Sequence, residues 1–179
     1  MGEGARVTFF VHDGLSFRLP SMEDLPAIAE LRNDPSTWCQ LTDPLPVTPR
    51  DQKAWLESLS LRNGRFYAAA FSGQHPFIGL VRMDERDSQN RSIRVGLDVV
   101  PKLRGLGYGT SIYQAVLAYA FDQLNCHRVW LQVLQTNKRG ARLYEKLGFK
   151  TEGILREAVF RDGRYVDYTV MSILEGERP

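Results

Sequence analysis

The segment Arg104-Gly105-Leu106-Gly107-Tyr108-Gly109 stands between a stretch typical of a β-strand and a stretch typical of an α-helix. Residues 93–100 are rich in β-branched side chains, and residues 107–124 carry apolar side chains at four-residue steps. Glycines at such a turn adopt backbone conformations that other residues resist, and they let a ligand come close to the main chain. The free amides of the first helical turn, with the helix dipole, attract anions. The segment therefore predicts a pyrophosphate site, although a turn that uses glycine for packing alone has the same pattern.

Two other phosphate-binding motifs do not fit this segment. A P-loop ends in Gly-Lys-Ser/Thr, whereas Gly109 is followed directly by Thr110. The dinucleotide fingerprint Gly-x-Gly-x-x-Gly, begun at Gly105, needs a third glycine where Thr110 stands. The spacing therefore disfavours an NAD-binding interpretation.

The rest of the chain alternates between strand and helix patterns. Polar turns separate short β-rich runs at residues 66–71, 77–83 and 93–100, which predicts an antiparallel meander. Ser21 and Asp24 form a capping signal before a helix that the breaker Asp34-Pro35 ends. The predicted order is ββααβββαβαββ, which is an α/β or α+β fold with a mixed sheet. The remaining predicted elements are extended runs in 7–19, a helix at 49–61, a strand at 128–134, a helix at 137–147 before the cap Gly148, and a closing hairpin in 154–174.

Length and composition fit one globular domain, residues 1–179, in which residues 1–14 form an N-terminal extension with a short strand. A net charge of +2 does not provide the basic surface that nucleic-acid binding needs. Cys39 and Cys126 are far apart, so we expect neither a disulfide framework nor a metal site. The sequence begins with no signal peptide and has no apolar run long enough for a membrane span, which predicts a cytoplasmic protein with no membrane partner.

The sequence resembles the GNAT superfamily of N-acetyltransferases in two blocks. Arg104, Gly107 and Gly109 match the family motif Arg/Gln-x-x-Gly-x-Gly/Ala. Residues 137–149, NKRGARLYEKLGF, match the family's asparagine, a tyrosine seven positions later and a final Gly-Phe. The tail 153–167 resembles the branch that contains ribosomal-protein N-terminal, polyamine and nucleotide-amino-sugar acetyltransferases. The resemblance implies a mixed, mostly antiparallel sheet of about seven strands flanked by about four helices, with two splayed central parallel strands.

The resemblance also implies a reaction and a co-substrate. The expected enzyme is an N-acetyltransferase that moves the acetyl group of acetyl-coenzyme A directly to a primary amine of a small molecule, an amino sugar or a protein N-terminus. It would act without a metal, as a monomer or homodimer. Asn137 is also a preferred helix cap, so its role stays open. The residues expected to bind the cofactor are Leu97, Val99, Arg104, Gly105, Leu106, Gly107, Tyr108, Gly109, Thr110 and Asn137.

The resemblance points to Tyr144 as the catalytic acid that protonates the departing thiolate, whereas a core tyrosine would fit the same helix pattern. The base is less defined, because Gln132 stands where several relatives carry a glutamate. Asp98, on one strand face with Arg94 and Gly96, is the nearest carboxylate, and a base acting through ordered water is the other option. Arg94 would suit an anionic acceptor if it faced the acceptor cleft. Gln132 and Arg94 also allow an alternative, a non-catalytic acyl-coenzyme A-binding regulatory module.

Overall fold

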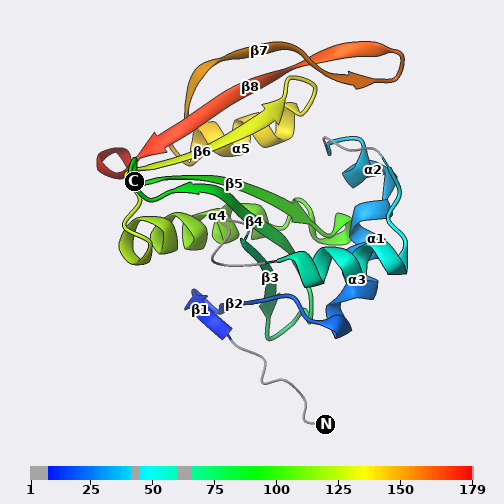
Figure 1. Cartoon of the computed structure of the whole chain (residues 1–179). Coiled ribbons are helices and arrows are strands. Elements are labelled where there is room, and N and C mark those ends of the chain that lie inside the picture. Colours follow the sequence, from blue (N-terminus) through cyan, green and yellow to red (C-terminus); the bar gives the residue numbers. More distant parts are fainter. Residues whose placement is uncertain (1–7, 42–44, 60–65, 179) are drawn as a thin grey trace.

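The computed structural model describes residues 8–41, 45–59 and 66–178 (Figure 1). Its strands form one sheet in the order β1-β2-β3-β4-β5-β6-β8-β7. The strands are β1 (Thr8–His12), β2 (Leu15–Arg18), β3 (Phe66–Ser72), β4 (Gly79–Asp87), β5 (Ser92–Val99), β6 (Arg128–Leu134), β7 (Lys150–Arg161) and β8 (Arg164–Leu174), and the α-helices are α1 (Leu25–Asn33), α2 (Pro35–Trp38), α3 (Pro49–Ser58), α4 (Tyr108–Ala118) and α5 (Lys138–Lys146).

The pair β5–β6 is the parallel one in this otherwise antiparallel sheet. Its pairing runs from Ser92↔Arg128 to Arg94↔Trp130 and then stops. β5 continues to Val99 and β6 to Leu134, so the two strands part beyond that point. The mixed, mostly antiparallel sheet with splayed parallel strands is therefore confirmed, with eight strands and five α-helices among the described residues.

The additional helix comes from the segment that the sequence indicated as a breaker. Asp34 ends α1, and its side chain accepts a hydrogen bond from the amide of Ser36 at 2.9 Å, which caps α2. Pro35 suits the first position of a helix because its missing N–H would be unpaired there. The Asp34-Pro35 pair thus stops one helix and starts the next. In the second predicted helix, 49–61, α3 ends at Ser58, and residues 60–61 lie outside the described residues.

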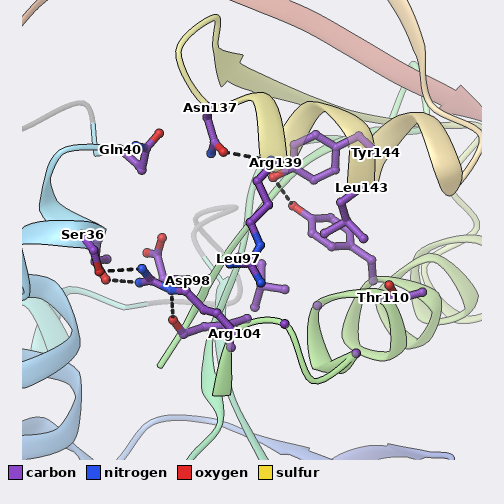
Figure 2. A pocket seen from close by; sticks show the side chains of 17 residues that line it. Ser36, Gln40, Leu97, Asp98, Arg104, Thr110, Asn137, Arg139, Leu143 and Tyr144 are labelled. Atoms are coloured by element: carbon purple, nitrogen blue, oxygen red, sulfur yellow. Dashed lines mark hydrogen bonds between the residues drawn. The ribbon is translucent and has the colours of Figure 1, made fainter. Parts of the chain in front are cut away.

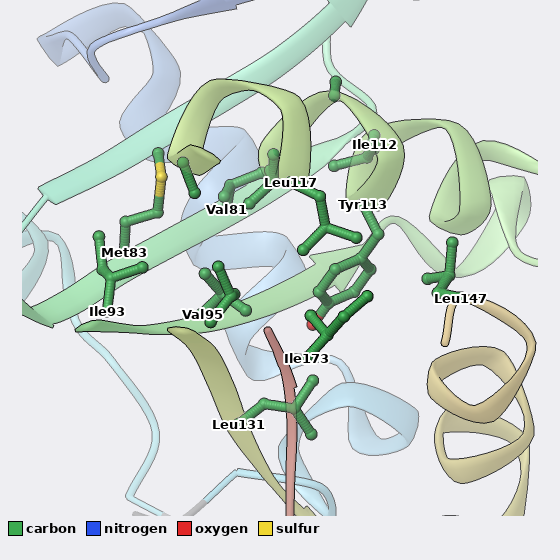
Figure 3. Packing of buried hydrophobic residues seen from close by; sticks show 14 of the residues in the cluster. Val81, Met83, Ile93, Val95, Ile112, Tyr113, Leu117, Leu131, Leu147 and Ile173 are labelled. Carbon is green, nitrogen blue, oxygen red and sulfur yellow. The ribbon is translucent and has the colours of Figure 1, made fainter. Parts of the chain in front are cut away.

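Helices cover the two faces of the sheet and bury separate clusters. On one face, α4 packs its apolar stripe against β4, β5 and β6, forming the main core (Figure 3). On the other, Ile28 and Leu31 of α1 pack against Leu80 of β4, with Trp55 of α3 beside them. The parting of β5 from β6 therefore leaves a gap between these two helical layers.

The β7–β8 hairpin extends past the end of β6 as an arm (Figure 1). It has its own small core of Leu134, Val159, Val166 and Tyr168. A bulge between Leu155 and Val159 bends β7, and the Glu157 amide donates to Asp167 Oδ1 at 2.8 Å. Arg161 near the tip donates to the carbonyl of Leu41, just beyond α2. The arm and the α2 segment are thus joined on the same side of the molecule.

No helix within 8–41, 45–59 and 66–178 is long and apolar enough to cross a membrane. Over the same ranges, no group of three or more His, Cys, Asp or Glu side chains is arranged to hold a metal ion.

Candidate functional site

A cleft of about 530 Å³ lies where β5 and β6 part (Figure 2). Four regions distant in sequence form its walls: α2 with Gln40 just beyond it, the end of β5, the glycine-rich turn with the start of α4, and α5. Its lining residues are Ser36, Thr37, Gln40, Leu97, Asp98, Val99, Arg104, Gly105, Gly107, Gly109, Thr110, Tyr113, Asn137, Arg139, Gly140, Leu143 and Tyr144.

The glycine-rich turn presents its backbone to the cleft. Gly105 and Gly107 have φ angles of 90° and 92°, a region that favours glycine because it has no Cβ. Within the described residues, no acceptor takes the amide protons of Gly105, Leu106 and Gly107. α4 begins directly afterwards, at Tyr108, so its first-turn amides and its dipole point the same way. Unpaired amides at a helix N-terminus fit a pyrophosphate.

The end of β5 offers a second row of backbone groups. Leu97, Asp98 and Val99 pair with β4 through one edge, and their other edge faces the gap left by β6. All three line the cleft. An unpaired strand edge binds an extended amide-containing chain as if it were an added strand. This edge fits the amides of a pantetheine arm.

Arg104 anchors the turn to α2 through its side chain. Its guanidinium donates to the carbonyl of Val99 at 2.8 Å, to Ser36 Oγ at 2.7 Å and to Thr37 Oγ1. These bonds use the side chain for structure. They connect the glycine turn to the end of β5 and to α2, and the predicted role of Arg104 in cofactor binding stays a prediction.

Arg139 lies across the cleft from the glycine turn, and its side chain points from α5 toward it (Figure 2). A Cβ added at Gly105 would lie 3.4 Å from Arg139 Nη2. The side chain is exposed, and no carboxylate of the described residues forms an ion pair with it. An exposed arginine beside unpaired amides provides a second, charged contact for a phosphate.

Asn137 caps α5 and also lines the cleft. Its Oδ1 accepts a hydrogen bond from the Gly140 amide at 2.8 Å, which is the geometry of a helix N-cap. Of the two interpretations that the sequence left open, the structure shows the helix cap, and the contact with the cofactor stays a prediction. The cap fixes where α5 begins, and thereby where Tyr144 lies two turns later.

Tyr144 faces the cleft from α5, next to a second tyrosine on α4. The hydroxyl of Tyr113 donates to the Tyr144 hydroxyl at 3.3 Å, and the ring centroids are 5.2 Å apart. Burial raises the pKa of Tyr144, while the hydrogen bond from Tyr113 acts in the opposite direction. Tyr144 is consequently protonated at neutral pH and able to donate a proton into the cleft.

Among the described residues that line this cleft, Asp98 is the one carboxylate. Burial raises its pKa above the ordinary range, and the positive charges of Arg32, Arg82 and Arg104 act in the opposite direction. A carboxylate with a raised pKa is a better proton acceptor than an ordinary aspartate. Asp98 and Tyr144 thus place an acceptor and a donor of protons in the same cleft.

Arg94 does not line this cleft, and its contact with an anionic acceptor stays a prediction. Its guanidinium donates to both oxygens of Asp84, at 2.8 and 3.0 Å, and forms an ion pair with Glu85 at 2.8 Å. The side chain shares a strand face with Asp98, as alternation predicted. It lies four residues away, roughly 13 Å along the strand. Gln132 is also absent from the lining.

Two other predicted cofactor residues, Leu106 and Tyr108, do not reach the cleft with their side chains. Leu106 is 66% exposed, and Tyr108 packs against the core with its ring beside His75. Their backbone amides remain part of the turn. The sequence interpretation missed Ser36, Thr37, Gln40, Tyr113, Arg139, Gly140 and Leu143. Helical spacing could have indicated that Tyr113 faces the cleft, because it lies one turn after Gly109. No sequence pattern indicated that residues of α2 line the cleft.

Comparisons with known proteins agree with this geometry. Residues 15–150 match the acetyltransferase (GNAT) domain family. The chain is 36% identical over 104 residues to spermidine N(1)-acetyltransferase of Vibrio cholerae, which covers 58% of this chain and 60% of that protein. It is 28% identical over 163 residues to a prophage-derived N-acetyltransferase of Bacillus subtilis, covering 90% of each chain.

A solved structure of the Vibrio cholerae spermidine N-acetyltransferase, in complex with CoA and spermine, superimposes with a TM-score of 0.86. The two chains are 28% identical there, and the match covers 93% of this chain and 98% of the other. Fold, cleft and sequence matches therefore lead to one conclusion. The chain belongs to the GNAT family of N-acetyltransferases, whose co-substrate is acetyl-coenzyme A, as its two sequence motifs predicted.

Proposed function

We propose that this protein transfers the acetyl group of acetyl-coenzyme A directly to a primary amine in the cleft between β5 and β6. The observation that carries the proposal is that Asp98 and Tyr144, a carboxyl and a phenol with raised pKa values, line one cleft beside an unpaired strand edge. A non-catalytic binding module would need the turn and the strand edge but neither of these side chains.

The backbone from Gly105 to Thr110 would hold the pyrophosphate of the co-substrate. The exposed edge at Leu97 and Val99 would pair with the pantetheine amides, which places the thioester in the gap between the strands. Arg139 would contact a phosphate, since its guanidinium lies beside Gly105. Among the described residues, the amides of Gly105, Leu106 and Gly107 have no other acceptor, and the side chain of Arg139 is exposed.

The proposed chemistry assigns one proton to each side chain. As the amine nitrogen bonds to the carbonyl carbon, Asp98 takes the proton that the nitrogen loses. As the carbon–sulfur bond breaks, Tyr144 gives its hydroxyl proton to the departing sulfur. General acid–base help of this kind is worth about 10²–10⁴-fold in rate. Exchange with solvent then restores both side chains.

The charge of the cleft bears on the acceptor. Spermidine is one candidate, because the Vibrio cholerae relative is a spermidine N-acetyltransferase. The lining, however, contains Arg104 and Arg139 and a single carboxylate, Asp98. Among the described residues, no further carboxylate lines the cleft to attract a polycation, so we also propose a second candidate class: amines whose molecule carries an anionic group.

A thiol-release assay with acetyl-coenzyme A tests the activity and both candidate acceptor classes. The panel contains spermidine, an N-terminal peptide, a nucleotide-linked amino sugar, and the matched pair glucosamine and glucosamine 6-phosphate. We expect release on at least one amine and a loss of about 10²-fold or more in Tyr144→Phe. Tyr165→Phe, on the exposed hairpin tip, is the control and keeps full activity. Tight binding of acetyl-coenzyme A without release on any amine would favour the binding module instead.

The number of subunits, predicted as a monomer or homodimer, is a separate proposal. β7 is the last strand of the sheet, and no described strand pairs with its outer edge. An unpaired edge is a template for pairing with another chain. Light scattering of the full chain measures the oligomeric state, and a larger assembly would contradict the proposal.

A further inference from the structure

Tyr113 has a hydroxyl in a place where the surroundings are mostly apolar. It lies on α4 and is 2% exposed, and its ring packs against Tyr144 and Phe149 at centroid distances of 5.2 and 6.2 Å. Its neighbours in the core are side chains such as Leu117, Leu131 and Ile173 (Figure 3). A phenylalanine would fill the same space without burying a polar atom, which costs free energy unless that atom is hydrogen-bonded.

The Tyr113 hydroxyl has one hydrogen-bond partner among the described residues, the hydroxyl of Tyr144. Tyr113 donates in this bond and Tyr144 accepts. A phenol has a single proton to donate. Because Tyr144 accepts from Tyr113, its own proton is not used in this bond and is available to a partner in the cleft that both residues line.

We propose that Tyr113 is a positioning residue that aims the Tyr144 proton at the departing sulfur and stabilises the phenolate that remains. The inference rests on the proposed acid role of Tyr144. When Tyr144 gives its proton to the sulfur, the electron pair of the broken O–H bond stays on the Tyr144 oxygen. The Tyr113 O–H already points at that oxygen, and no proton leaves Tyr113 in this step.

The ionisation of both phenols agrees with this division of roles. Burial raises the pKa of Tyr113 well above its ordinary value, so Tyr113 stays protonated and keeps its donor. The hydrogen bond from Tyr113 lowers the pKa of Tyr144 relative to what burial alone would produce. The distance of 3.3 Å is longer than the common range for O–H···O bonds. Hydrogen bonds at catalytic groups are often long without substrate and tighten when it binds.

The test is a double-mutant cycle in the full chain, measured by thiol release with the best acceptor of the panel. Tyr113→Phe is expected to lower kcat about tenfold with the KM for acetyl-coenzyme A unchanged. In the Tyr144→Phe background, the same substitution is expected to change kcat less than twofold, because no proton remains to be aimed. Tyr67→Phe, which removes a hydroxyl on the opposite face of the sheet beside Trp55, is the control and leaves kcat unchanged.

Three results would overturn the inference. The first is an unchanged kcat in Tyr113→Phe, and the second is an equal loss in the two backgrounds. The third is a loss of kcat that accompanies a large fall in melting temperature, because the hydroxyl would then serve the fold. A fully active Tyr144→Phe is a different outcome, which would overturn the acid role of Tyr144 and with it the role of Tyr113.

Discussion

Arg104 donates a hydrogen bond of 2.7 Å to Ser36, a residue 68 positions earlier in the chain. Arg104 begins the glycine-rich turn, and Ser36 lies in α2, so one side chain connects two opposite walls of the cleft. The same guanidinium also holds the carbonyl of Val99 at the end of β5. The position of the glycine-rich turn and the position of α2 therefore depend on each other.

Replacing Arg104 tests this connection. Arg104→Gln loses charged hydrogen bonds, which contribute about 1.5–3 kcal/mol when a partner is removed. We expect the free energy of unfolding in urea to fall by about 2 kcal/mol and the KM for the amine to rise, because α2 loses its anchor. Arg50→Gln, at an exposed position of α3, should change neither quantity. Normal KM values in Arg104→Gln would show that α2 is held by other contacts.

Gly107→Ala tests the shape of the turn without steric overlap. A Cβ at Gly107 would meet no atom within 4 Å, but the φ of 92° is unfavourable for alanine by about 1–2 kcal/mol. We expect a loss of stability in that range and weaker binding of coenzyme A, measured by calorimetry. Gly73→Ala is the matched control, because its Cβ also meets nothing and its φ is not positive. Unchanged binding in Gly107→Ala would argue against a backbone cradle.

Arg139→Gln tests the charged contact across from Gly105. We expect the Kd for coenzyme A to rise about fivefold to tenfold, the effect of losing roughly 1 kcal/mol of a charge-assisted bond. The difference from wild type should shrink at high salt, since exposed charges are screened. Arg142→Gln removes a neighbouring exposed charge of α5 that does not line the cleft. An equal effect of both substitutions would indicate general attraction and not a specific contact.

Asp98→Asn tests the proposed base and has a defined pH dependence. A base works when deprotonated, so the wild-type rate should fall as the pH drops through the pKa of Asp98, which burial raises above its ordinary value. We expect kcat/KM to fall about 10²-fold or more at neutral pH in Asp98→Asn. In Asp98→Asn, the fall in rate at low pH that is due to Asp98 should disappear from the pH–rate profile. The fall that is due to protonation of the amine substrate should remain in both proteins.

Although Asp98→Asn should lose activity, its free energy of unfolding should not fall. A carboxyl whose pKa is raised by folding stabilises the protein only when protonated, and this contribution is lost as the pH rises through the folded pKa. At neutral pH the ionised carboxylate is therefore a cost. Urea unfolding at pH 7 should show Asp98→Asn to be as stable as wild type or more so. A variant that loses activity and stability together would point to a structural role.

The sequence predicted those parts of the cleft that come from continuous motifs. The glycine turn, the cap at Asn137 and the cleft position of Tyr144 are set by local spacing, since each lies at a fixed distance from a helix start. The end of β5 followed from the turn, because Leu97 and Val99 come immediately before it. For these residues, the positions predicted from local sequence spacing agree with the structure.

Residues whose place depends on long-range packing could not be predicted in this way. Ser36 and Thr37 lie in the cleft wall through long-range contacts such as their hydrogen bonds with Arg104, and no pattern around residue 36 indicates those contacts. Arg94 was placed correctly on a strand face, but alternation does not say which end of the strand faces the gap. That depends on where pairing with β6 stops, which is at Arg94↔Trp130.

The early end of β5–β6 pairing also has a consequence for how the molecule responds to its ligand. From Val95 to Val99, β5 is joined to β4 but not to β6, so beyond Arg94 the sheet consists of two halves without hydrogen bonds between them. In the proposed binding mode, an extended co-substrate along that edge would act as a missing strand, and its amides would pair with the β5 backbone. Hydrogen exchange in this stretch should then slow sharply upon binding. The complex would then unfold more cooperatively than the free protein, because the bound ligand would join the two halves of the sheet.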